Sequence, residues 1–334
     1  MSKEKMTTNK KRNAGTIAIV LALLLFVGCG SKSPVNGIEI VRYEKLLFET
    51  QPQEMHAALK TFASENATPL LTIYPDDPGF MKEIEGFVAD PVVKDIYNIT
   101  NKRYGDLAWL QRTLSEAIKK AAKVDDEIKI AKVYTLVSGM VDYDKRIMVD
   151  RESGSACICL DLYALPQMEK YSYFSMPMFI VERCDSAYLA TDFMAAVARK
   201  YIVAPDEKNV SMLDFMISEG KVLYFLDQVL PRTEDFIKIR YTAEQMEWMK
   251  KNESQVWTYF IKNDLLYEKD FTRFHNFVDE APKTNAFNNS APRTTDYIGW
   301  QIVKNYMKTS GCSMKELFDN NNAQQILQES GYKP

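Results

Sequence analysis

Apolar residues recur at helical spacing over much of the first third of the chain after residue 50. This spacing predicts an amphipathic helix over residues 52–66. Two further helical stretches are expected around residues 80–87 and 104–124, and in the second the lysines lie opposite an apolar stripe. Residues 38–47 mix apolar and charged positions, and we expect them to lead into the first helix.

The period of the pattern then shortens. Three segments rich in Val, Ile and Tyr, separated by turn residues, predict a small central sheet of three or four strands. These segments are residues 128–137, 146–149 and 156–163.

Helical spacing returns in the C-terminal half. The expected helices cover residues 187–202, 212–230, 243–261, 295–307 and two short pieces near the C-terminus. Ser211 is placed to cap the second of these, and Thr242 with Gln245 and Ser313 with Glu316 have the spacing of capping boxes. Helices, then a sheet, then helices predict an α+β fold whose C-terminal half is mostly helical.

The N-terminus has the pattern of a lipoprotein signal peptide. Lys10, Lys11 and Arg12 precede an uncharged apolar run over residues 14–27, which is shorter than the roughly 20 residues of a membrane-spanning helix. The run ends in Phe26-Val27-Gly28-Cys29, which reads as a lipobox. We therefore expect a signal peptide over 1–28, a covalent lipid on Cys29 and attachment to a membrane through it. An ordinary signal peptide cleaved near a chance cysteine is the alternative.

After Cys29, small and polar residues predict a flexible tether over 29–37, followed by a single globular domain over 38–334. The chain is 46% hydrophobic and 12% aromatic, with a formal net charge of −3. No basic cluster follows the signal peptide, so we do not expect a nucleic-acid partner. An exported protein can form disulfides, but the sequence leaves their pairing open, and buried free thiols are an equal alternative. The cysteines concerned are Cys157, Cys159, Cys184 and Cys312.

Three C-terminal blocks resemble the gliding-motility lipoprotein family GldB. They are residues 216–231, 297–307 and 325–334, and residues 159–163, which we take as an edge strand, and 252–257 also fit that pattern. The resemblance implies an envelope lipoprotein, anchored to the inner or outer membrane. The residues directly after Cys29 include Lys32 and no acidic export cluster, so we expect the chain to face the periplasm rather than the cell exterior. The partners that the resemblance implies are envelope proteins of the gliding machinery or of linked secretion machinery. The resemblance implies no reaction.

A second resemblance concerns architecture. Zinc peptidases of the gluzincin kind have an edge strand, a helix with His-Glu-x-x-His and a further helix that supplies a Glu. Here the strand over 156–163 and the helix over 187–202 are followed by Glu219-Gly220. A zinc centre of this kind needs two histidines one helical turn apart and a carboxylate that takes a proton from the metal-bound water. Here Thr191 and Ala195 occupy the two histidine positions, and Asp192 occupies the position of the carboxylate. We therefore expect a zincin-like fold that has lost its metal site: a pseudo-enzyme with no cofactor beyond the lipid.

Each of the remaining candidate residues can also have a purely structural role. Glu219 falls on the core-facing side of its helix. It is either a ligand that remains from a lost metal site or a structural carboxylate paired with Arg, Tyr or backbone N–H groups. We expect Asp192 to face water rather than to pair with Arg199 or Lys200. Asp161 reads as a turn or edge residue rather than a base. Gly220 reads as a point of close helix packing, and Tyr297 falls on an aromatic stripe of core type.

These patterns predict a non-catalytic scaffolding or partner-binding lipoprotein, in which a partner strand would add to the sheet edge at the former active site. Two other functions stay open. One is a hydrolase that uses Asp161, Asp192 or Glu219. The other is a carrier of a small envelope ligand, which an enclosed apolar cavity would favour.

Overall fold

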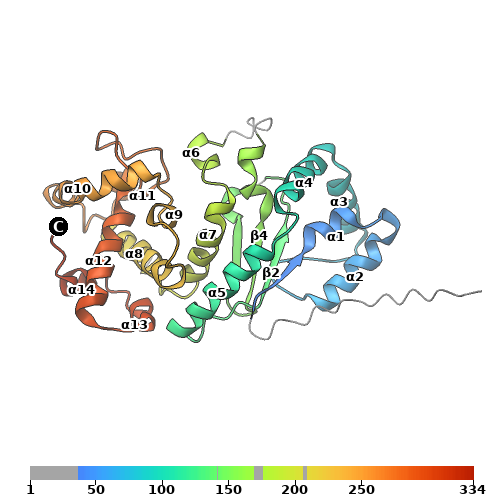
Figure 1. Cartoon of the computed structure of the whole chain (residues 1–334), viewed down its shortest axis with the longest axis horizontal. Helices are drawn as coiled ribbons and strands as arrows, with labels where there is room; N and C mark the ends of the chain where they lie inside the picture. Colours follow the sequence, from blue (N-terminus) through green and yellow to red (C-terminus); the bar gives the residue numbers. More distant parts are fainter. Residues whose placement is uncertain (1–36, 141, 169–175, 206–208) are drawn as a thin grey trace, which may run out of the picture. The chain divides into compact units, whose positions relative to one another are not determined.

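The computed structural model describes residues 37–140, 142–168, 176–205 and 209–334 (Figure 1). The predicted signal peptide, Cys29 and all but the last residue of the predicted tether lie outside the described residues. The fold is α+β, as the sequence predicts, with a four-stranded sheet between helices. None of the helices in these ranges has both the length and the apolar character that crossing a bilayer requires.

The sheet has the strand order β1-β2-β4-β3. Its strands are β1 (Glu39–Arg42), β2 (Lys132–Leu136), β3 (Ile147–Asp150) and β4 (Ser155–Cys159). The strands β1, β2 and β4 are parallel, and β3 runs antiparallel to β4 at one edge. The strand β1 was not predicted, because its four residues are too few to show an alternation that distinguishes a strand. It leads into helix α1 (Tyr43–Glu49).

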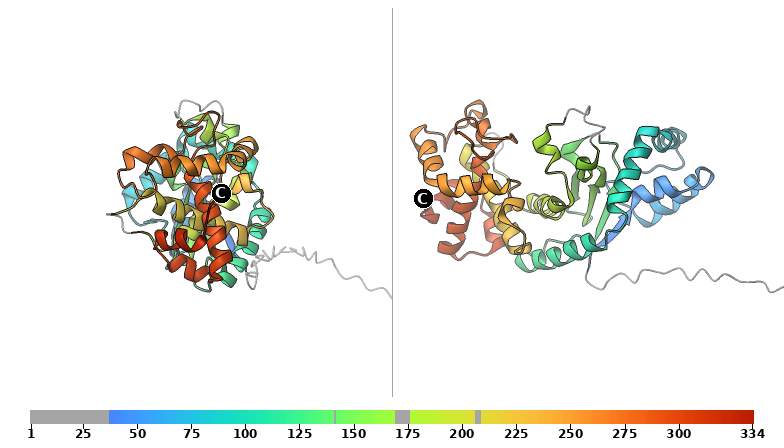
Figure 2. Two further views of the ribbon diagram at one scale, coloured as in Figure 1. Left: turned by 90° about the vertical axis from the view of Figure 1, so that its left-hand side faces the viewer. Right: turned by 45° about the horizontal axis from the view of Figure 1, so that its top comes forward.

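The two faces of the sheet bury different side chains. Val133, Ala156 and Ile158 belong to the larger hydrophobic core. Tyr134 and Cys157, at the alternate positions, belong to a smaller core that α1 and the following helix complete. Figures 1 and 2 show the blue and cyan N-terminal helices on one side of the sheet and the yellow to red helices on the other.

The N-terminal helices agree with the predictions except at one place. They are η1 (Pro52–Glu54), a 3₁₀ turn, and then α2 (Met55–Glu65), α3 (Pro78–Ala89), α4 (Pro91–Tyr104) and α5 (Ala108–Val124). Helix α4 was missed. The side chain of Asp90 accepts hydrogen bonds from the N–H groups of Val92 and Val93, and Pro91 occupies the first helical position. Asp90 and Pro91 therefore start a helix here. Because the same two residue types are also common in turns, the sequence alone did not distinguish the two.

The C-terminal half is helical, as predicted. After the short turns η2 (Tyr143–Lys145), η3 (Leu160–Tyr163) and η4 (Leu165–Gln167), the helices are α6 (Met178–Val181), α7 (Ser186–Arg199), α8 (Met212–Val229), α9 (Asp235–Lys238), α10 (Ala243–Lys262), α11 (Phe271–Val278), α12 (Thr294–Ser310), α13 (Met314–Asp319) and α14 (Ala323–Ser330). Ser211, Thr242 and Ser313 each form a reciprocal capping box at the start of α8, α10 and α13. The three predicted caps are confirmed.

Helices α8 and α12 pack through two glycines. A Cβ added at Gly220 would overlap the carbonyl group of Gly299 and lie 3.0 Å from the backbone nitrogen of Trp300. A Cβ at Gly299 would overlap the carbonyl of Met216 in the same way. The prediction that Gly220 allows close helix packing is therefore confirmed.

The predicted strand over 156–163 was wrong in two respects. Strand β4 ends at Cys159, and residues 160–163 form the turn η3. The strand is also not at an edge, because it lies between β2 and β3. The edge strand on this side of the sheet is β3, which precedes β4 in the chain and pairs with it along its whole length as an antiparallel neighbour.

The four cysteines of the described chain carry free thiols. Cys157, Cys159 and Cys184 are buried, and Cys312 is half-buried. Burial raises the pKa of the Cys157 thiol to about 12 and that of Cys184 to about 11. These thiols behave as small apolar side chains of the core rather than as nucleophiles.

Candidate functional site

A charged cleft of about 360 Å³ lies where α7, α8, the turn after α9 and the start of α12 meet. Five basic and five acidic side chains line it: Arg146, Arg199, Lys238, Arg240 and Arg293, with Asp144, Asp192, Glu219, Glu280 and Asp296. One wall is apolar and consists of Val222, Leu223, Leu226 and Ile239. These residues come from distant parts of the sequence, so only the folded chain brings them together.

Asp192 is the most firmly held of these side chains. Its Oδ2 accepts a hydrogen bond from the Tyr163 hydroxyl at 2.8 Å and from Arg146 Nε at 3.3 Å. Arg240 Nη1 also donates to it. Burial alone would raise the pKa of this carboxyl, but the charges of Arg240 and Arg146 outweigh that effect and lower it.

The expectation that Asp192 faces water was wrong. The residue is 7% exposed and pairs with neither Arg199 nor Lys200. Its two arginine partners lie 46 and 48 residues away in the sequence. No local pattern could have identified them.

Glu219 forms a second ion pair across the cleft. Arg199 Nε and Nη2 donate to its two carboxylate oxygens at 3.1 and 2.6 Å, in a bidentate arrangement that joins α7 to α8. The carboxylate is 29% exposed, which is more open than its place in the helical pattern suggested. Burial would raise the pKa of Glu219, but the Arg199 charge and hydrogen bonds lower it.

Two of the cleft arginines have a backbone conformation that L-residues rarely adopt. Arg240 has φ +58° and Arg293 has φ +42°. Such a left-handed residue costs about 1–3 kcal/mol, and these conformations are concentrated at functional sites. Backbone carbonyls fix both side chains: Arg240 Nη2 donates to Arg183 O at 3.2 Å, and Arg293 Nη2 donates to Ile239 O at 2.6 Å. The strained backbone at Arg240 and Arg293 thus places both guanidinium groups at the cleft.

Asp296 is the one acid of the cleft whose pKa is raised into the neutral range. Burial, supported by the nearby Glu219 charge, raises the pKa of Asp296 to about 7, against the opposing charges of Arg293 and Arg199. Arg293 Nη1 lies 3.2 Å from its Oδ2. Sequence reasoning missed Asp296, because an acidic residue in the first turn of a helix is usually a solvated end residue. It missed Arg146, Arg240 and Arg293 because no spacing connects them.

The structure brings together only some of the residues singled out in the sequence. Asp192, Ala195 and Glu219 line the cleft. Thr191 is buried and its hydroxyl donates to Tyr188 O at 2.8 Å. Tyr297 is buried on α12, and its hydroxyl donates to Glu253 at 3.3 Å.

Asp161 lies apart from the cleft and is fully buried. Its Oδ2 accepts hydrogen bonds from Ser138 N and Oγ and from Met140 N, at 3.1, 2.8 and 2.9 Å. These bonds hold the loop after β2, where Gly139 and Met140 both have positive φ. Asp161 thus lies in the turn η3, which confirms the turn alternative of the prediction, and its buried carboxylate supports a neighbouring loop.

The donor set does not fit a zinc centre. Ala195 offers no donor atom, and the Thr191 hydroxyl is already bonded to the backbone. His56 contacts Asp76 at 3.1 Å and His275 contacts Asp279 at 3.3 Å, both outside the cleft. Across the described ranges, no group of three or more His, Cys, Asp and Glu side chains is arranged to hold a metal ion.

Comparison with known proteins gives one relationship. The model of the family described as gliding motility protein GldB matches residues 30–334. Neither the curated proteins nor the solved structures gave a match.

Proposed function

The chain belongs to the GldB family of gliding-motility proteins, and from this premise we propose that it is a lipid-anchored, non-catalytic binding protein of the envelope. The family is one of motility proteins and indicates a role in the cell envelope, where association with the motility machinery is expected.

The observation that carries the non-catalytic role is the ion pairing of the cleft. A general base needs a lone pair directed at its substrate and a pKa near the working pH. Asp192 Oδ2 accepts hydrogen bonds from Tyr163, Arg146 and Arg240. The pKa of the Asp192 carboxyl is lowered. Glu219 is held by both donors of Arg199. Neither carboxylate is disposed to accept a proton from water.

The edge of the sheet offers a place for a partner. Cys159 N donates to Arg146 O at 2.9 Å, which makes these two residues a hydrogen-bonded pair of the β3–β4 ladder. By alternation, the N–H and C=O groups of Ile147 and Val149 point away from β4, and no described backbone group bonds to them. Because Arg146 precedes this strand and lines the cleft, an extended partner segment that pairs with β3 would reach the cleft.

The anchor rests on the lipobox at Cys29 and on the polar residues that follow it. A covalent lipid there would keep the domain at a membrane surface, facing the periplasm, within the length of the tether.

A charge swap tests the cleft as a binding surface. Arg199→Glu or Glu219→Arg alone breaks the ion pair, whereas the double variant restores a pair of opposite polarity. The double variant should fold like the wild type, because both side chains reach solvent. We expect it to lose the envelope proteins that cross-link to the wild type in cells, together with motility in cells that glide. Wild-type cross-links and motility in the double variant would show that this surface is not used.

A hydrolase remains the second candidate, favoured by one observation. The raised pKa of Asp296, about 7, is suited to a general acid, and the residue lines the cleft beside Glu219. Turnover of peptide or glycan substrates that Asp296→Asn abolishes would establish this function in place of the non-catalytic one.

A further inference from the structure

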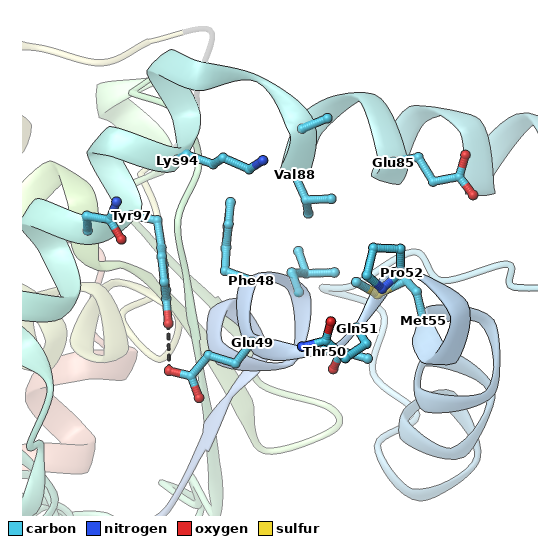
Figure 3. Close-up of a pocket in the computed structure, with 13 residues that line it drawn as sticks. Phe48, Glu49, Thr50, Gln51, Pro52, Met55, Glu85, Val88, Lys94 and Tyr97 are labelled. Carbon is cyan, nitrogen blue, oxygen red and sulfur yellow. Dashed lines mark hydrogen bonds between the residues drawn. The ribbon is translucent and has the colours of Figure 1, made fainter.

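An apolar groove lies on the other side of the sheet from the charged cleft. It has a volume of about 600 Å³ and is formed by α1, the turn after it, and helices α3 and α4 (Figure 3). Its floor consists of Leu47, Phe48, Met55, Val88 and Tyr97. Leu47, Met55 and Tyr97 belong to buried clusters of the fold, so the floor is continuous with the interior.

Aromatic contacts fix the floor of this groove. The rings of Phe48 and Tyr97 stack at 4.4 Å between centroids, with 12° between their planes. Figure 3 shows the two rings side by side, with the Tyr97 hydroxyl bonded to Glu49; that distance is 2.8 Å. The surface is therefore formed before any partner arrives, which lowers the cost of binding.

A second hollow continues the groove around α1. It has a volume of about 680 Å³ and shares Glu49 and Thr50 with the first. Its far wall is the face of α2 that carries Ala57, Ala58 and Thr61. These short side chains, three and four residues apart, let another helix approach α2 closely.

Negative charge surrounds both hollows. Glu49, Glu54, Glu65 and Glu85 line them, and Lys94 is the one basic residue in either lining. Glu54, Glu65 and Glu85 are exposed, and none has an ion-pair partner among the described residues. Four carboxylates around an apolar floor favour a partner with apolar residues at its centre and positive charge at its margins.

We propose that this groove, formed by α1 to α4, binds an amphipathic helix of another protein, with its apolar stripe on the floor and its lysines or arginines facing the four glutamates. An apolar stripe at helical spacing fits a groove with a hydrophobic floor. An anionic membrane surface would be repelled by the same glutamates. The inference does not depend on the charged cleft, since the two sites share no residue.

The test uses the chain from residue 30 onward and a synthetic 18-residue helix of leucine and lysine, with leucines at i, i+3, i+4 and i+7. A matched peptide carries glutamate in place of each lysine. We expect the lysine peptide to bind in low salt and to protect the backbone amides of residues 46–65 and 85–98 from hydrogen exchange. The glutamate peptide should bind at least about tenfold more weakly. Absence of binding by the lysine peptide, or protection elsewhere in the chain, would overturn the proposal.

The matched variants are Glu54→Lys with Glu85→Lys, and Glu83→Lys as the control. Glu54 and Glu85 are exposed and have no ion-pair partner in the described part of the chain, so their reversal should leave the fold intact. Glu83 lies on the same helix as Glu85 but outside the groove. We expect the double variant to weaken binding about tenfold and the control to leave it within about twofold. Equal binding by the double variant and the control would overturn the proposal. So would a dimer of this chain that the double variant alone dissociates, because the groove would then belong to a second copy.

Discussion

The guanidinium group of Arg240 and the carboxylate of Asp192 form a buried ion pair that joins the turn after α9 to the middle of α7. The side chains are 7% and 6% exposed. Arg146 and Tyr163 bind the same carboxylate oxygen, so one acid organises three partners. Removal of one member of such a buried group leaves the others without compensation, which is why breaking a buried pair costs far more than the pair contributes.

Asp192→Asn should therefore destabilise the folded chain by about 3–5 kcal/mol, because Arg240 and Arg146 would remain buried without a counter-charge. Urea unfolding followed by circular dichroism measures the loss. Asp144→Asn is the matched control, since Asp144 lines the same cleft but is exposed and forms no ion pair with another described residue. It should stay within about 0.5 kcal/mol of the wild type. A small effect of Asp192→Asn would mean that the network does not hold the cleft.

The raised pKa of Asp296 predicts a pH dependence of stability. The folded chain holds this proton up to about pH 7, whereas the unfolded chain releases it at about pH 3.9. The contribution of this carboxyl to stability is therefore complete below the unfolded pKa and is lost as the pH rises through about 7. The wild type should lose stability relative to Asp296→Asn between about pH 4 and about pH 7. Parallel curves for the two proteins over that range would contradict the assignment.

The contact between Gly220 and Gly299 predicts opposite effects for two glycine substitutions. Gly220→Ala should destabilise the chain by about 1–3 kcal/mol, because its Cβ would overlap backbone of α12. Gly86→Ala, inside α3 with nothing near its added Cβ, should stabilise the chain by about 0.5–1 kcal/mol. Thermal unfolding of both variants distinguishes the cases. Similar melting temperatures for the two would show that α8 and α12 are farther apart.

The anchor at Cys29 predicts how the protein fractionates. Cys29→Ser should move the chain from the membrane fraction to the soluble fraction, because no acyl group could be attached. Cys312→Ser is the control, since this half-buried thiol lies in the folded domain and should leave the chain with the membrane. Membrane association of Cys29→Ser that survives a high-salt wash would show that another part of the protein provides the attachment.

Local patterns predicted the parts of the fold that local chemistry decides. The capping boxes at Ser211, Thr242 and Ser313 need residues three apart, and all three were visible in the sequence. The long amphipathic helices were visible for the same reason. Elements were missed where they are short, as in β1, or where a proline starts a helix rather than ending a turn, as in α4.

The candidate site shows the opposite limit. Asp192 and Glu219 were identified from the order of elements, and the structure places both in one cleft. Pairing of Glu219 with an arginine was one of the predicted alternatives, and Arg199 is that partner. The partners of Asp192 could not be predicted, because Arg146 and Arg240 reach it from distant parts of the sequence. An ion pair between residues far apart in sequence has no periodic pattern, so its partners become known only from the fold.

The non-catalytic role requires that the cleft hold no catalytic metal ion. Its test is the zinc content of the chain from residue 30 onward, purified without metal-affinity resin and measured by elemental mass spectrometry. We predict zinc far below one atom per chain, unchanged in Asp192→Asn, because Thr191 and Ala195 supply no ligand and Asp192 is held by arginines. About one zinc atom per chain, lost in Glu219→Ala, would contradict the non-catalytic role and make the cleft a metal centre.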